Sequence, residues 1–214
     1  MYLIGDIGNS EIKICLVNKK NKIFKRINFS AINLSLKDLN KNLDKIKNYL
    51  PKVEKVLFCS VVPKYLNLIK RFLKPKTKVK LFEVKQLNLS SIIKIKVNYR
   101  QVGSDRITNA ISLADNKKNY IIIDLGTATT FDVLIKNVYI GGIIAPGVKL
   151  SLSTLSDKAS LIPNVNLKKI KRIIGNDTIT AVRSGFFWGY AGLIDNIVNL
   201  IKKEARKSFK IIIT

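Results

Sequence analysis

The chain has 214 residues, of which 47% are hydrophobic, so it can bury a core and is not a disordered basic tail. It carries 39 Lys and Arg against 14 Asp and Glu, a formal net charge of +25, and no histidine. Catalysis by Ser-His or Cys-His pairs is therefore excluded. No apolar run reaches the roughly 18 residues that a membrane span needs.

Strands and helices alternate along the first half of the chain. Two strands, at 2–8 and 11–17, meet at a Gly-Asn turn. A helix over 35–50 has apolar residues at helical spacing and closes at Pro51. These apolar residues are Leu36, Leu39, Leu43, Ile46 and Leu50. The other predicted strands are 21–29, 55–63, 78–84 and 92–97, and the other helices are 63–75 and 103–116.

The same order of elements recurs in the second half. The predicted strands are 120–125, 130–135, 138–147 and 209–214, and the predicted helices are 147–158 and about 177–205. A unit made of a strand hairpin and helices is therefore duplicated, with domains at 1–115 and 116–214. This alternation predicts an α/β fold.

Cys15 and Cys59 both lie inside apolar runs that are typical of strands. Buried free thiols are expected, and the lack of a C-x-x-C motif gives a structural zinc site little support. No signal peptide is visible at the N-terminus, so a cytoplasmic location is expected.

Two similar turns carry candidate chemistry. In each, an apolar strand ends in an aspartate, followed by a glycine and small polar residues: Asp6 with Gly8, and Asp124 with Gly126. Outward-pointing amides in such turns suit phosphate oxygens, and the aspartate can hold a cation that neutralises the phosphate. The alternative is two ordinary hairpins with Asp-Gly turns.

The segment "VGSDRITNA" at 102–110 places an acid and an arginine at a helix start. Asp105 could take a proton from a substrate hydroxyl while Arg106 holds an anion. The alternative is that Asp105 only interacts with the helix dipole. A carboxylate is the natural base in a chain without histidine.

Two groups of glycines have open explanations. Gly141, Gly142 and Gly147 allow either close approach to a ligand or a tight turn from strand to helix. A second group lies along one face of the helix at 177–205, where it allows packing within the core or at a subunit interface: Gly185, Gly189 and Gly192.

The lysines are spread along the whole chain, without a dense basic tract. Most of the charge is therefore interpreted as solvated lysine faces. Nucleic-acid binding is a less favoured alternative to this interpretation, and attraction of anionic small molecules such as nucleotides also remains open.

Five motifs in order resemble type III pantothenate kinases, a family of the actin-like, sugar-kinase and Hsp70 ATPase superfamily. They are "DIGNS", "GSDR", "DLGTATTFD", "GGIIAPG" and "DTITAVRSG". The resemblance implies duplicated ribonuclease H-like domains with mixed five-stranded sheets flanked by helices. It also implies a homodimer that phosphorylates pantothenate with ATP, Mg²⁺ and a monovalent cation, K⁺ or NH₄⁺, in coenzyme A biosynthesis.

The resemblance also implies roles for single residues. Asp105 is similar to the proton acceptor, Asp124 to the potassium ligand and Thr127 to an ATP contact. The ATP phosphate motif corresponds to Asp6, Ile7, Gly8, Asn9, Ser10, Glu11, Ile12 and Lys13. The pantothenate site corresponds to Tyr99, Gly103, Ser104, Asp105, Arg106 and Thr178. In the family, Asp105 and Thr178 would meet only across the dimer interface.

The sequence departs from the family pattern in two places. Tyr99 precedes Gly103 by four positions, three fewer than the family tyrosine. The family also continues past its last strand with a Gly-Gly turn and a helix near the nucleotide, where this sequence ends at Thr214. Adenosine binding is expected to be weaker or to be supplied in another way.

The preferred hypothesis is a pantothenate kinase that uses direct in-line transfer, with Asp6 and Asp124 as the anchors of Mg²⁺ and K⁺. One alternative is a kinase for another small hydroxyl compound. The other is a non-catalytic regulatory or nucleic-acid-binding member of the same fold.

Overall fold

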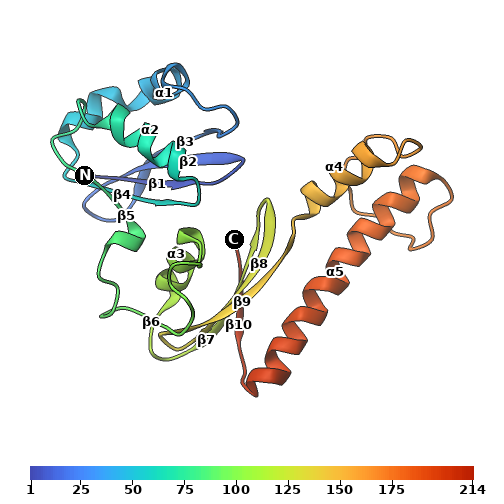
Figure 1. Ribbon diagram of the computed structural model, residues 1–214. Coiled ribbons are helices and arrows are strands. Elements are labelled where there is room, and N and C mark those ends of the chain that lie inside the picture. Colours follow the sequence, from blue (N-terminus) through green and yellow to red (C-terminus); the bar gives the residue numbers. More distant parts are fainter. The chain divides into compact units, whose positions relative to one another are not determined.

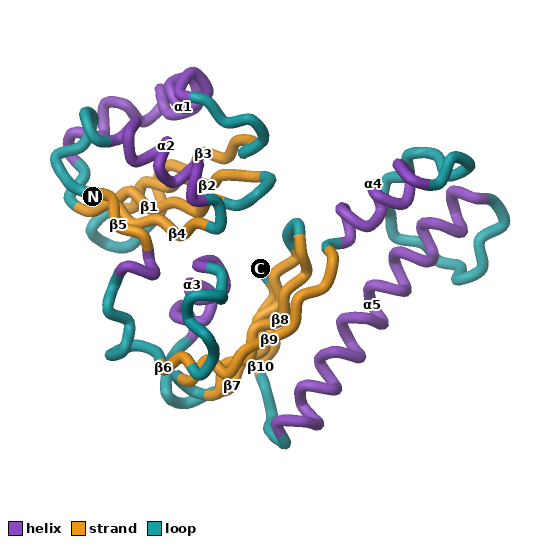
Figure 2. Tube along the Cα trace, viewed as in Figure 1, coloured by secondary structure: helices purple, strands orange, loops and turns teal.

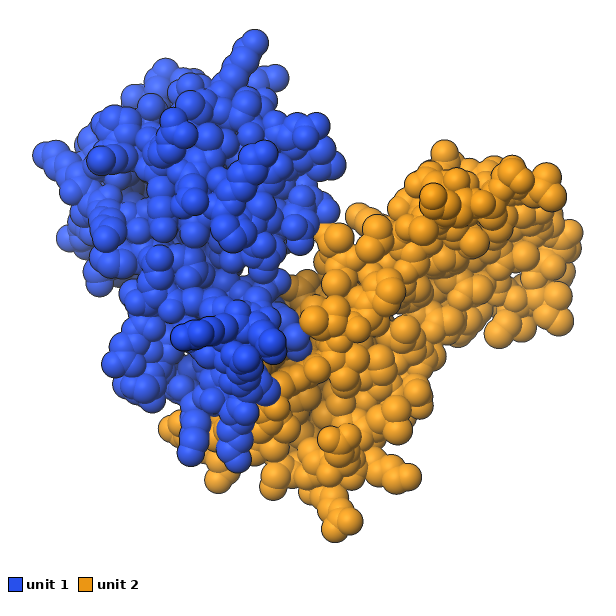
Figure 3. Space-filling view, viewed as in Figure 1, with its two compact units in different colours: residues 1–112 blue, residues 113–214 orange.

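The computed structural model describes all residues, 1–214, and divides into two compact units, Met1–Ser112 and Leu113–Thr214. Figure 3 shows the two units in different colours. Both are built from strands and helices, so the predicted α/β fold is confirmed. None of the helices combines the length and the apolarity that a membrane crossing requires.

The first unit contains a mixed sheet in the order β3-β2-β1-β4-β5. The strand β1 is antiparallel to β2 and parallel to β4, so the sheet joins an N-terminal hairpin to parallel strands. Figure 2 shows these strands in orange. The elements of this sheet are β1 (Tyr2–Ile7), β2 (Glu11–Val17), β3 (Ile23–Ser30), β4 (Lys55–Ser60) and β5 (Leu81–Glu83).

The helices α1 (Leu36–Leu43) and α2 (Pro63–Leu73) lie on the same face of this sheet (Figure 1). Their apolar residues form one core with the inward side chains of the strands. The core includes Leu3, Ile7, Ile12, Leu39, Leu43, Val56, Phe58, Leu66, Ile69 and Phe72. Burial of this apolar face is what holds α1 and α2 on the sheet.

The prediction of one α-helix over 35–50 identified the buried side chains correctly but was wrong about the kind of helix in its second half. The segment is α1 followed by a 3₁₀-helix, η1 (Asp44–Lys52), and Pro51 lies inside η1 instead of ending the helix. Ile46 and Leu50 are buried as expected. A spacing of three or four residues is typical of an α-helix and a spacing of three is typical of a 3₁₀-helix, so a short apolar pattern does not separate the two kinds of helix.

The second unit contains a mixed sheet in the order β10-β7-β8-β9. The pairs β7–β8 and β8–β9 are antiparallel, and β10 is parallel to β7. One end of the long helix α5 packs on this sheet, where Val198 and Ile201 contact Ile121, Ile123 and Phe131. The elements are β7 (Asn119–Leu125), β8 (Ala128–Ile135), β9 (Val138–Pro146), α4 (Val148–Lys158), α5 (Thr178–Ala205) and β10 (Lys210–Ile213).

The segment between β5 and β7 has little regular structure before its helix. It contains a short 3₁₀-helix, η2 (Val84–Gln86), the two-residue strand β6 (Lys94–Ile95) and α3 (Ser104–Leu113). The strands predicted at 78–84 and 92–97 are therefore longer than those observed. Alternation of apolar and polar residues does not show how many of them find a neighbouring strand.

Candidate active site

Asp6 is the candidate phosphate-site carboxylate of the first unit. It stands next to the last residue of β1, in register with Lys13 on β2 and Cys59 on β4. The thiol of Cys59 donates a hydrogen bond to Asp6 Oδ1 over 3.3 Å. Burial raises the pKa of the Cys59 thiol, so this group stays protonated and remains a donor. Both cysteines are buried and reduced, as predicted.

Burial raises the pKa of the Asp6 carboxyl above its usual value. The Cys59 hydrogen bond and the charge of Lys13 oppose the rise, whereas the charges of Asp105 and Glu11 add to it. Asp6 and Asp105 are thus close enough for their charges to repel each other. Two carboxylates held together at a cost to the folded protein are typical of a functional site.

Replacing Asp6 with asparagine should therefore stabilise the metal-free protein. The folded-state pKa of Asp6 is raised, so the penalty for its charge is absent at low pH and fully present once the pH exceeds the folded pKa. In EDTA without nucleotide, we expect Asp6→Asn to raise Tm by at least about 2 °C at pH 8 and by less at pH 4. A Tm that is unchanged or lower at pH 8 would contradict this reasoning.

The turn after Asp6 has its main chain fixed and its polar side chains exposed. Gly8 N donates to Glu11 O over 3.0 Å, and Asn9 and Ser10 are exposed. In contrast, Ile7 and Ile12 are fully buried. Any contact of these two isoleucines with ATP would therefore have to come from their main-chain atoms.

Asp105 lies in the first turn of α3, where its Oδ1 accepts a hydrogen bond from Arg106 N at 2.8 Å. A side chain at Gly103 would overlap Asp105 Oδ1, so the carboxylate lies directly over the Gly103 main chain. The adjacent Ser104 is buried and donates its hydroxyl hydrogen to Glu83 Oε1. The structure thus brings Asp6, Asp105 and their flanking turns together within one unit.

The hydroxyl of Tyr99 already donates a hydrogen bond within the chain. Its hydroxyl donates to the main-chain oxygen of Lys85 over 3.0 Å. Burial, together with the negative charge of Glu83, raises the pKa of Tyr99. The geometry favours a role for Tyr99 in holding its own loop.

The second candidate turn, in the other unit, follows β7. Gly126 N donates to Ala128 O over 3.1 Å, and Gly147 N donates to Thr127 O over 3.0 Å. A Cβ atom at Gly147 would overlap Gly126 O and Thr127 O, so only glycine fits there. Close packing of two backbone segments therefore explains Gly147 without a ligand.

The polar side chains that follow Asp124 are hydroxyl groups, those of Thr127, Thr129 and Thr130. No group of three or more His, Cys, Asp or Glu side chains in the chain could cage a metal ion. A cation at this turn would have to be held by the Asp124 carboxylate with main-chain oxygens. That donor set fits a hard monovalent cation better than a transition metal.

Thr178 is the first residue of α5 and is exposed. The preceding Asp177 caps the helix by accepting a hydrogen bond from Thr180 N at 2.8 Å. The Asp177 carboxylate is therefore used as the helix cap. Thr178 lies beside it on the surface of the second unit.

The glycine face of α5 does not pack inside its own unit. A Cβ atom at Gly185, Gly189 or Gly192 would meet nothing within 4 Å. The prediction that these glycines pack within the core is therefore wrong. The other prediction, that they lie at a subunit interface, stays open. Trp188 beside them is 42% exposed, although it makes an edge contact with Phe187. The exposed surface of this helix thus includes three large apolar side chains, those of Ile179, Trp188 and Leu200.

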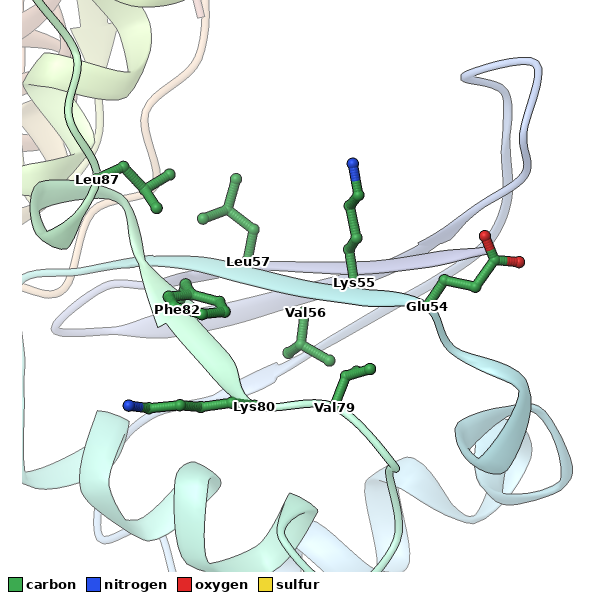
Figure 4. A pocket seen from close by; sticks show the side chains of 8 residues that line it. All are labelled: Glu54, Lys55, Val56, Leu57, Val79, Lys80, Phe82 and Leu87. Carbon is green, nitrogen blue, oxygen red and sulfur yellow. The ribbon is translucent and has the colours of Figure 1, made fainter.

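A cavity of about 420 Å³ in the first unit is lined by none of the candidate site residues. It opens at the amino-terminal half of β4, whereas Cys59 is near the other end of that strand. Figure 4 shows Lys55 and Leu57 pointing to one side of β4 and Val56 to the other. Phe82 and Leu87 complete a mainly apolar lining, which is unsuited to phosphate.

The sequence alone did not identify the residues that contact the candidate site residues. Cys59 was interpreted only as a buried thiol, and Glu83 and Lys85 were interpreted only as parts of a strand and the residues after it. The one available signal was Glu83, an acid inside the otherwise apolar run "LFEV". Its partner, Ser104, lies 21 positions away, which no local pattern could reveal.

Comparison with known proteins gave consistent matches. A family model described as type III pantothenate kinase matches residues 2–200. A type III pantothenate kinase of Pelagibacter ubique is 63% identical over 221 residues, covering 100% of this chain and 86% of that protein. One of a Sulfurihydrogenibium species is 34% identical over 230 residues, covering 100% and 87%.

Two solved structures resemble the fold. A Sinorhizobium meliloti protein assigned as a 2-dehydro-3-deoxygalactonokinase has a TM-score of 0.56 at 9% identity, covering 100% of this chain and 93% of its own. A Campylobacter jejuni protein assigned to the Baf family of transcriptional activators has a TM-score of 0.55 at 18% identity, covering 98% and 80%. At these identities the likeness concerns the fold alone.

Proposed function

Because the chain belongs to the type III pantothenate kinase family, we propose that it transfers the γ-phosphoryl group of ATP to the primary hydroxyl of pantothenate. This reaction is the first step of coenzyme A biosynthesis. The observation that carries the proposal is the charge interaction between Asp105 and Asp6. It supports a candidate base lying beside the turn that resembles the ATP phosphate motif.

In the proposed reaction, Asp105 accepts the proton of the attacking hydroxyl. The hydroxyl oxygen forms its bond to the γ-phosphorus as the bond from that phosphorus to the ADP oxygen breaks. The turn at Gly8–Ser10 and the Lys13 ammonium face the phosphates, and Arg106 attracts the pantothenate carboxylate. No phosphoenzyme is required.

The proposed reaction also requires two cations. Asp6 would anchor Mg²⁺, and Asp124 with main-chain oxygens of its turn would hold K⁺ or NH₄⁺. Both ions would supply positive charge that offsets the negative charge of the phosphates. The exposed Asn9 and Ser10 would contact phosphate oxygens beside Asp6.

The direct test is a coupled assay that measures ADP release with ATP, Mg²⁺, K⁺ and pantothenate. Turnover with pantothenate and none with a sugar such as glucose is expected. Turnover with another hydroxyl compound instead would favour a different kinase. No turnover at millimolar ATP would favour the regulatory alternative.

The reaction should depend on a monovalent cation, because Asp124 lies in a turn whose nearby donors are oxygen atoms. We expect full activity in K⁺ or NH₄⁺ and at most about a tenth of it in a Tris-only buffer. Asp124→Asn should remove most of the K⁺ stimulation. The measurement is initial rate against KCl concentration at fixed ionic strength, kept constant with tetramethylammonium chloride. Equal rates in the two buffers would refute the role.

We also propose that the active form is a homodimer that uses α5. Only Ser184, Val198 and Ile201 of this 28-residue helix are buried. Small residues on an exposed apolar face allow a second helix to approach closely. A solvated apolar helix of this length is otherwise unfavourable.

A further inference from the structure

We propose that Glu83 and Lys85 are positioning residues, which hold the segment 99–105 so that Asp105 is placed for catalysis. The inference rests on the proposed kinase function but concerns residues to which the proposed reaction assigns no contact with substrate. Glu83, the last residue of β5, is a buried carboxylate, and Lys85 follows just after that strand. The side chains of both residues hydrogen-bond to the segment 99–105.

Glu83 is 8% exposed, and each of its carboxylate oxygens has a partner. Oε1 accepts from the Ser104 hydroxyl, and Oε2 accepts from Lys85 N at 2.8 Å. Burying a carboxylate is costly unless it is hydrogen-bonded. Here the burial links the end of β5 to the residue immediately before Asp105. Ser104 is itself 1% exposed, so the link is shielded from water.

Lys85 is attached to the same loop by its side chain and by its main chain. Its Nζ donates to Val102 O over 2.8 Å and to Arg100 O over 3.4 Å. The ammonium also lies 5.0 Å from the centre of the Tyr99 ring, and the Tyr99 hydroxyl donates to Lys85 O. An ammonium group has three donors, so it can bind two carbonyls while it contacts the ring face.

The loop has little else to define its position. Residues 96–103 contain no helix or strand. Their local hydrogen bonds are those of a turn, from Gln101 N to Asn98 O and from Arg100 N to the Asn98 side chain. Because the Asp105 carboxylate lies over Gly103, a shift of residues 102–104 moves the candidate base with them. A displacement of about 1 Å can cost about 100-fold in rate.

The main test uses Lys85→Met, which keeps the apolar stem and removes the ammonium. We expect kcat/KM for pantothenate to fall by about 10- to 100-fold, with KM for ATP changed by less than about threefold. Lys80→Met is the matched control, because the Lys80 ammonium contacts only the Phe82 ring, at 5.9 Å. This control should keep wild-type kinetics.

A purely structural role would give a different result. It would lower Tm and reduce the parameters for both substrates together, without selectivity for pantothenate. A Lys85→Met enzyme with kcat/KM for pantothenate within twofold of wild type would overturn the proposal. Lys85→Arg, which restores a cation with several donors, should recover part of the lost kcat/KM.

Amide hydrogen exchange separates this proposal from the proposed function. In Lys85→Met, amides within 99–106 should exchange at least about fivefold faster, while those of β1 and β2 stay unchanged. Glu83→Gln, together with Ser104→Ala, gives a second measurement on the same loop, and the effects of this pair should not add. Unchanged exchange would refute the positioning role even if the wild type were an active kinase. Faster exchange without any wild-type turnover would refute only the kinase assignment.

Discussion

Asp105→Asn is expected to lower kcat by about 10² to 10⁴-fold while the protein stays folded. An amide is not a base, so the proton of the attacking hydroxyl would have no acceptor. The fold should persist because an asparagine oxygen can still accept the hydrogen bond from Arg106 N. The measurement is kcat in the coupled assay, with circular dichroism as the check on folding.

The matched control is Asp44→Asn, which removes a carboxylate from an exposed ion pair with Lys47 at 2.7 Å. Such surface pairs contribute little, so the control should keep wild-type turnover. Nucleotide binding by the Asp105→Asn variant should also persist, since the phosphate motif is intact. A variant within a few-fold of wild-type kcat would remove Asp105 from the role of base.

The elements that sequence predicted correctly are those whose signal is local. The two hairpins, α2, α4 and α5 are confirmed, because apolar periodicity and Gly or Pro at their ends define them within a few residues. The strands β5 and β6 were predicted too long, since a strand also needs a neighbour. Whether η1 is an α-helix or a 3₁₀-helix depends on hydrogen bonds that the apolar pattern does not encode.

The candidate site was predictable in its residues but not in its contacts. Asp6 and Asp105 were identified from turn chemistry and from the lack of histidine. These two residues are 99 positions apart in the sequence, and their interaction depends on how the fold brings the start of α3 to the end of β1. Partners such as Cys59 and Glu83 follow from strand register and loop packing, so they required the structure. Tyr99 was expected to face the substrate, yet its hydroxyl is engaged with Lys85.

Gly189→Leu should abolish both dimer formation and turnover, if α5 is the subunit interface. A Cβ atom at Gly189 would meet nothing within 4 Å in its own chain, so we expect leucine to leave the folded subunit undisturbed. Leucine is also about 1 kcal/mol better than glycine inside a helix. Any loss of assembly would therefore arise from steric overlap with the second copy.

The consequence for catalysis follows from the sequence resemblance, which implies that Asp105 and Thr178 complete one pocket only across the interface between two subunits. A monomeric Gly189→Leu protein should then lose pantothenate phosphorylation while the phosphate turn of its own chain still binds nucleotide. Asn40→Leu is the control, because it adds an exposed leucine to α1, a helix of the first unit that the proposed interface does not use. Sedimentation velocity followed by the kinase assay decides between the outcomes. A wild-type monomer with full activity, or a monomeric variant that keeps its turnover, would show that one subunit holds the whole site.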